Sequence, residues 1–149
     1  MQQVVSARTP AHLWIVGILS LLWNCFGAYD YMMTRTRNME YLSQMGDPNS
    51  MLAYIDGMPM YAQIGWGLGV WAGLLGAVLL LMRSRYALWS FAASLVGMAM
   101  SFGGQYLGGP PMPPEMTAGA MKYMPLLIIA LGLAQAWYAW RQTKTGVLR

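Results

Sequence analysis

Two polar residues interrupt the first long apolar stretch of the chain. Asn24 lies near the middle of this stretch, and Asp30 follows within two helical turns. Because an amide surrounded by hydrocarbon needs a hydrogen-bond partner, we expect Asn24 to face protein rather than lipid. One interpretation is an outward polar path that ends at Asp30. The other is a structural bond from Asn24 to Trp71 or Ser94 on a neighbouring helix, with Asp30 meeting water.

A solute path would need further polar and aromatic side chains at a similar depth. Tyr31 shares a helical stripe with Asn24, and other candidates lie in the outer parts of later apolar segments. In a small-solute transporter these side chains should converge on one outward cavity. The candidate set is Asn24, Asp30, Tyr31, Gln63, Trp66 and Gln105.

Methionine is unusually frequent, at 15 of 149 residues, and 13 of these fall within 32–60, 98–100 and 112–124. Thioethers are soft ligands that favour Cu(I), and closely spaced pairs are weak candidates for such a site. Methionine also suits adaptable surfaces that meet other proteins, which is the alternative interpretation. The paired candidates are Met58, Met60, Met98 and Met100.

Other reactive residues do not form a catalytic pattern. His12 is the only histidine and Cys25 the only cysteine, and the sequence has no Gly-rich phosphate loop and no Ser/His/Asp set. A lone histidine at the edge of an apolar stretch is typically solvated, and a lone cysteine within one packs as a small apolar side chain. We therefore expect no enzyme activity and no cofactor.

The composition excludes a soluble globular domain. Hydrophobic residues make up 57% of the chain and charged residues only 9%, whereas soluble domains carry about 25% charged residues. The charges are clustered, and the stretches between them are long enough as helices to cross a hydrocarbon core of about 30 Å. The net charge of +4 is accounted for by basic residues beside these stretches, so we expect no nucleic-acid partner.

The pattern predicts an all-α polytopic membrane protein forming a single domain, an antiparallel bundle of four transmembrane helices. A cleaved signal peptide at 13–23 is the competing interpretation of the first segment, but it lacks a suitable cleavage site. The single domain covers 1–149, with spans at 11–33, 61–82, 86–107 and 121–141 and outer loops at 34–60 and 108–120.

The distribution of positive charge predicts both termini on the cytoplasmic side. Lysine and arginine in short loops resist translocation. With this orientation three basic residues and all five acidic residues lie outside, and six basic residues lie inside. The inner set is Arg8, Arg83, Arg85, Arg141, Lys144 and Arg149.

The first outer loop predicts a short extracytoplasmic helix between spans one and two. Span one is expected to continue as a helix to about Met45, because no residue before Gly46 is a helix breaker. A short helix is then predicted, with Asp47 as its N-cap, Pro48 in the first helical position and Gly57 at its end. The proline-rich segment 110–114 predicts a stiff spacer, a strut or a docking strip.

Small residues recur at helical spacing on spans two and three. Such residues let helix backbones approach closely in a membrane, where the hydrophobic effect does not drive helices together. These surfaces fit packing within one bundle or against another chain. They comprise Gly65, Gly69, Gly73 and Ala77 on span two and Ala93, Gly97 and Ser101 on span three.

Several short motifs within residues 22–96 resemble one family. The motif residues are Trp23, Asn24, Gly27, Tyr29, Asp30, Tyr31, Thr34, Arg37, Asn38, Tyr41, Val70, Trp71, Gly73, Gly76 and Arg83. They resemble an uncharacterised family of small bacterial inner-membrane proteins with four helices, often labelled sugar transporters. The resemblance implies the bacterial inner membrane and the label implies solute movement. The methionine content and the 110–114 segment depart from the family pattern.

Three functional hypotheses follow. The first is a non-enzymatic accessory subunit of a larger membrane assembly, or a small homo-oligomer, whose partners are lipid and another membrane protein or itself. The second is a small-solute, sugar-like transporter with an outward cavity around Asn24 and Asp30. The third is extracytoplasmic handling of Cu(I), which requires three or more methionine sulfurs to converge.

Overall fold

The computed structural model describes residues 8–149, which form an all-α four-helix bundle. The long helices are α1 (Ala11–Arg35), α4 (Met60–Leu81), α5 (Tyr86–Leu107) and α7 (Met124–Lys144). Within the described residues, four helices are long and apolar enough to cross a membrane, the last one counted from Gly119. The protein is therefore a membrane protein of four transmembrane helices, as the sequence predicted.

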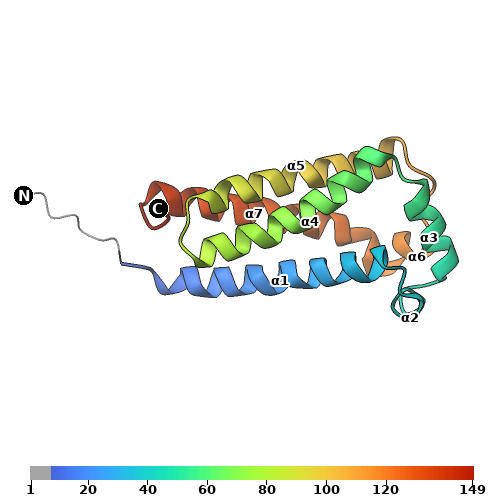
Figure 1. Ribbon diagram of the computed structural model, residues 1–149, viewed down its shortest axis with the longest axis horizontal. Coiled ribbons are helices and arrows are strands. Elements are labelled where there is room, and N and C mark those ends of the chain that lie inside the picture. The colour runs from blue at the N-terminus through green and yellow to red at the C-terminus, as the bar shows by residue number, and fades with distance from the viewer. Residues whose placement is uncertain (1–7) are drawn as a thin grey trace, which may run out of the picture.

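Short elements gather at one end of the bundle (Figure 1). They are α2 (Met39–Ser43), α3 (Pro48–Gly57), α6 (Pro114–Thr117) and the 3-10 helix η1 (Gly119–Tyr123). We call these four elements the cap. The beginning of α1, the α4–α5 turn and the C-terminus lie at the opposite end, which we call the terminal end.

The first outer loop differs from the prediction at one point. The first span ends at Arg35 instead of continuing to Met45, because Arg37 adopts a left-handed conformation with φ of 55°. The Asn38 amide donates to the Met33 carbonyl, a bond that closes the end of α1. Arginine rarely takes this conformation, so the sequence carries no signal for the break.

The α3 helix forms as predicted. The Asp47 carboxylate accepts hydrogen bonds from the Ser50 amide at 2.9 Å and from its hydroxyl at 2.6 Å. Pro48 occupies the first turn, where its missing N–H costs little. The hydrogen bonds from Ser50 lower the pKa of the Asp47 carboxyl below its ordinary value. The proline segment runs back along this helix, where Pro110 lies close to Gly57.

The glycine surfaces of α4 and α5 face each other within the chain. A Cβ added to Gly97 would collide with the Gly69 amide nitrogen and would lie 2.6 Å from the Gly65 carbonyl oxygen. The two backbones therefore touch at this crossing. Ser94 donates from its hydroxyl to the Gly69 carbonyl at 2.6 Å, and Ser90 donates to the Ala72 carbonyl at 2.7 Å.

The terminal end is solidly packed. Its core joins side chains of all four long helices to the C-terminal tail, in which Val147 and Leu148 are buried. The tail is held by backbone bonds, because the Arg85 amide donates to the Arg149 carbonyl and the Arg149 amide donates to the Arg83 carbonyl. The core residues are Leu13, Ala77, Leu80, Ala87, Phe91, Ala139, Val147 and Leu148.

Helices α1 and α7 form the looser seam of the bundle. The close helix pairs are α4 with α5, α1 with α4, and α5 with α7. Hydrogen-bonding contacts across the seam include the His12 ring nitrogen Nδ1, 2.6 Å from the Tyr138 hydroxyl, and the Asn24 amide, which donates to Gln135 at 3.5 Å. The first and last helices are therefore less closely packed against each other than the other neighbouring pairs.

Candidate functional site

A cavity of about 700 Å³ occupies the half of the bundle next to the cap. Its lining residues come from α1, α4, α5 and α7 and from α2, α3, α6 and η1 of the cap. The cavity is partly open to the surface, and the exposed lining residues Phe26, Met121 and Lys122 lie on the two sides of the α1–α7 seam. One half of the bundle is therefore solid and the other is hollow.

Four of the six predicted path residues line this cavity. Asn24 and Asp30 come from α1, Trp66 from α4 and Gln105 from α5. Three separate helices thus bring these side chains together, as the solute-path hypothesis requires. Of these two residues of α1, Asn24 lies farther from the cap and Asp30 lies nearer to it.

The other two candidates lie outside the cavity lining. The Tyr31 ring packs edge-on against Trp66 at 4.8 Å and Trp71 at 6.1 Å between ring centroids, so it supports the wall from behind. Gln63 accepts a 3.0 Å hydrogen bond from Arg35 and donates to the Met58 carbonyl at 3.1 Å. Its amide joins α1 to the start of α4 and has no place in the cavity wall.

Asn24 finds partners other than those expected. Its amide nitrogen donates to the Ser20 carbonyl at 2.8 Å and to Gln135 at 3.5 Å, in place of Trp71 or Ser94. Its amide oxygen lies against Gly73, whose missing side chain provides the space. Gln135 could not be selected from the sequence, because that pairing depends on how α7 faces α1.

Asp30 is half-buried and binds Tyr41 of the cap. The Tyr41 hydroxyl donates to the Asp30 carboxylate at 2.7 Å. Burial, and then the bond to Asp30, raise the pKa of the Tyr41 phenol above its ordinary value. The ion pair found among the described residues joins Arg37 to Asp56 at 2.8 Å, so Asp30 has no cationic partner within 8–149.

Sequence reasoning missed Tyr41, Tyr54 and Lys122 as lining residues. The contact of Tyr41 with Asp30 requires the chain reversal at Arg37, which has no sequence signal. Tyr54 is buried, and its hydroxyl has no hydrogen-bond partner among the described residues. Burial, followed by the charge of Tyr106, raises the pKa of this phenol. Lys122 holds its ammonium 4.8 Å from the centre of the Tyr123 ring.

Methionine side chains form much of the lining. Of the four proposed Cu(I) candidates, Met58 and Met98 line the cavity. Met60 is 73% exposed, and Met100 packs against Gly65, so each sequence pair is split between two environments. The methionines of the lining are Met45, Met51, Met58, Met98, Met112, Met116, Met121 and Met124.

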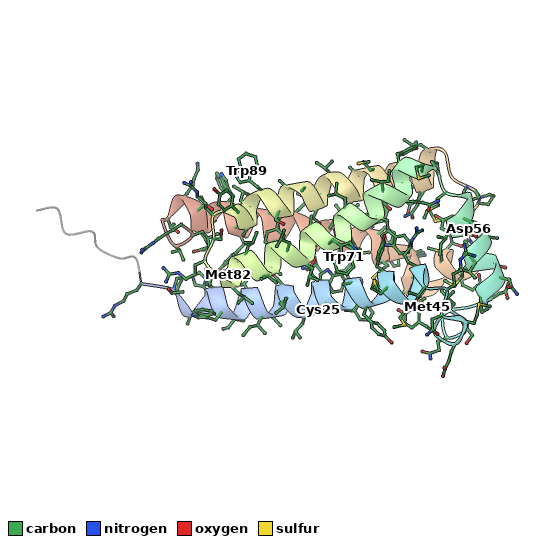
Figure 2. The ribbon with its side chains drawn as sticks, viewed as in Figure 1. Cys25, Met45, Asp56, Trp71, Met82 and Trp89 are labelled. Carbon is green, nitrogen blue, oxygen red and sulfur yellow. The ribbon has the colours of Figure 1, made fainter. Side chains whose placement is uncertain are left out.

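The remaining reactive residues lie away from the cavity. His12 contacts Tyr138 at the terminal end. Cys25 is exposed and points away from the bundle (Figure 2), so it faces lipid and is not packed inside. Within residues 8–149, no three His, Cys, Asp or Glu side chains come close enough to hold a metal ion.

The site belongs to a membrane-spanning four-helix bundle with a cavity that is open at one side and closed at its terminal end. No protein-family model matches the chain, and searches of curated proteins and of solved structures return no match.

Proposed function

We propose that this chain is a membrane-embedded solute-binding protein of the carrier type, which takes a small molecule into the cavity beneath its cap. The observation that carries the proposal is the convergence of Asn24, Asp30, Trp66 and Gln105 from three helices on one cavity. A cavity of about 700 Å³ falls within the range of about 300–1,000 Å³ typical of small-molecule sites. The sugar-transporter label of the family that the sequence resembles also implies solute movement.

The lining favours a solute with a largely apolar body. Methionine and aromatic side chains make up half of the lining residues, and the lining surface is mainly apolar. Methionine adapts its shape to different apolar partners. A polyhydroxylated sugar would leave many hydroxyl groups without partners in such a wall, and each unpaired group costs about 1–3 kcal/mol. The proposal therefore departs from the sugar-like solute of the sequence hypothesis.

The proposed orientation places the cap outside a bacterial inner membrane and both termini in the cytoplasm. Arg83 and Arg85 of the α4–α5 turn lie at the terminal end. The other basic residues at this end precede α1 or lie in the last turns of α7 and the C-terminal tail, and they are Arg8, Arg141, Lys144 and Arg149. Positive charge concentrates on the cytoplasmic side of membrane proteins. In this orientation the cavity receives its solute from the extracytoplasmic side or from the outer half of the bilayer.

Thiol accessibility tests whether the cavity admits solutes. In a Cys25→Ser background, Gln105→Cys places a thiol near the cap, and Met98→Cys places one in the α5 wall. A small cationic methanethiosulfonate added outside sealed, right-side-out vesicles should modify both thiols. Val96→Cys is the matched control, because Val96 lies on the same helix, is 56% exposed and does not line the cavity. A thiol in lipid forms little thiolate and should react slowly.

Each outcome of this experiment bears on the proposal. Modification at positions 98 and 105 with little at position 96 supports an accessible cavity facing outward. Equal and slow modification at all three positions contradicts it, provided that Ser50→Cys in the cap reacts rapidly. If the thiols react rapidly only with reagent added on the terminal side, the result contradicts the proposed orientation but supports an accessible cavity.

The accessory-subunit hypothesis has its own supporting observation. Only 6% of the apolar stretch of the last span is buried, so α7 presents a broad apolar surface to lipid or to another chain. Purification in mild detergent separates the two hypotheses. A reproducible larger complex supports the subunit function, and a single small species that binds solute supports the carrier.

A further inference from the structure

The cavity contains a carboxylate that the described chain leaves without a positive partner. Asp30 lines the wall and is half-buried, and its hydrogen bond comes from the neutral hydroxyl of Tyr41. Removing a carboxylate from water is costly unless a cation or several donors compensate. The site is therefore short of one positive charge, which an occupant of the cavity could supply.

Aromatic rings line the cavity that contains this carboxylate. Trp23 and Trp66 belong to the wall, and Tyr41 and Tyr54 of the cap join them. The negative face of an aromatic ring attracts cations, particularly organic cations that are weakly hydrated. A cavity that contains a carboxylate and is lined by several rings is thus complementary to a cation that also carries apolar surface.

The other charged residue of the lining does not neutralise Asp30. Lys122 is exposed, and its ammonium lies 4.8 Å from the centre of the Tyr123 ring. Within residues 8–149, Lys122 and Asp30 form no ion pair with each other. Lys122 therefore places its charge at the rim of the cavity, where water screens it.

From this arrangement we infer that the cavity binds an organic cation with an apolar body, such as a protonated amine or a quaternary onium ion, with Asp30 as its counter-charge. The inference rests on the proposed function, because it names the class of solute that the cavity takes. The methionine-rich wall accommodates the apolar body, and the rings and Asp30 select the charge.

Binding of tetraphenylphosphonium to the purified full-length protein in nanodiscs tests the inference. Triphenylphosphine oxide is the neutral probe, and tetraphenylborate is the anionic probe of matched shape. Equilibrium dialysis with empty nanodiscs subtracts partition into lipid. We expect saturable binding of the cation, and at least about tenfold weaker binding of the neutral and anionic probes, because only the cation pairs with Asp30.

Substitution separates charge recognition from shape recognition. Asp30→Asn should weaken binding of the cation by about tenfold and leave the neutral probe unchanged. Asp47→Asn is the matched control, because Asp47 is exposed, lies outside the cavity lining and keeps its helix cap as asparagine. The comparison of the three probes on the unaltered protein holds even if Asp30→Asn does not fold.

Two results would overturn the inference in distinguishable ways. If cation and neutral probe bind equally and Asp30→Asn affects neither, the cavity binds apolar solutes and the proposed function survives without the charge selection. If none of the three probes binds above the empty-nanodisc level, the proposed function fails together with the inference.

Discussion

Tyr41 donates a 2.7 Å hydrogen bond to Asp30 and thereby ties the short cap helix α2 to the carboxylate inside the bundle. The chain reversal at Arg37 makes this contact possible, because it turns the residues after α1 back toward the cavity mouth. The Tyr29 ring packs edge-on against Tyr41 with 5.6 Å between centroids. The position of the cap thus depends on a bond to the very group that is proposed to recognise the solute.

Tyr41 should remain protonated at a pH where ordinary tyrosines ionise. Its pKa is raised by burial and by the bond to Asp30, so the stability it contributes is complete below the ordinary tyrosine pKa and is lost as pH rises through the higher folded value. An alkaline titration followed by phenolate absorbance at 295 nm should show no difference between the protein and Tyr41→Phe near pH 10. A full phenolate step in that difference would contradict the buried bond.

Alanine at position 97 should destabilise the bundle strongly. Its Cβ would meet backbone atoms of Gly69 and Gly65, which a side-chain rotation does not move. We expect a loss of about 3 kcal/mol in the free energy of unfolding, measured by SDS titration in mixed micelles. Gly103→Ala is the control, because nothing lies within 4 Å of its added Cβ. Equal stability of the two variants would show that α4 and α5 are not in backbone contact.

Leucine at position 27 should fill the cavity without disturbing the fold. Gly27 lines the cavity, and a Cβ added there meets nothing within 4 Å. Tetraphenylphosphonium binding should fall by about tenfold or more, because the new side chain occupies the space of the solute. Gly103→Leu is the matched control, since Gly103 is equally uncrowded but lies outside the cavity lining. A loss of binding in both variants would point to a change in the helices themselves.

Truncation of Leu148 should destabilise the terminal end. The side chain is 3% exposed within the core that closes this end. Leu148→Ala should lower the free energy of unfolding by about 2–4 kcal/mol, as for other buried leucines. Leu107→Ala should change it by less than about 0.5 kcal/mol, because Leu107 is 88% exposed. A neutral Leu148→Ala would mean that the C-terminal tail does not pack as described.

The spans could be predicted because each depends on residues that are contiguous in sequence. Apolar length sets where a helix crosses the membrane, and the Asp47-Pro48 pair sets where α3 begins. Helix ends were less predictable: α1 ends at Arg35, just before the left-handed Arg37, and no residue type in the loop predicts that conformation. The uncrowded position of Gly27 likewise follows only from the packed structure.

The sequence by itself determined the four-helix membrane architecture, the glycine surfaces and four residues of the cavity lining, because these follow from local composition and helical spacing. Only the tertiary structure decided that Asn24 meets Gln135, that Tyr41 meets Asp30 and that Tyr31 and Gln63 lie outside the cavity. These relations join segments far apart in the chain. They depend on the rotation of each helix about its axis and on one backbone reversal, and in an almost uniformly apolar sequence the hydrophobic pattern specifies neither.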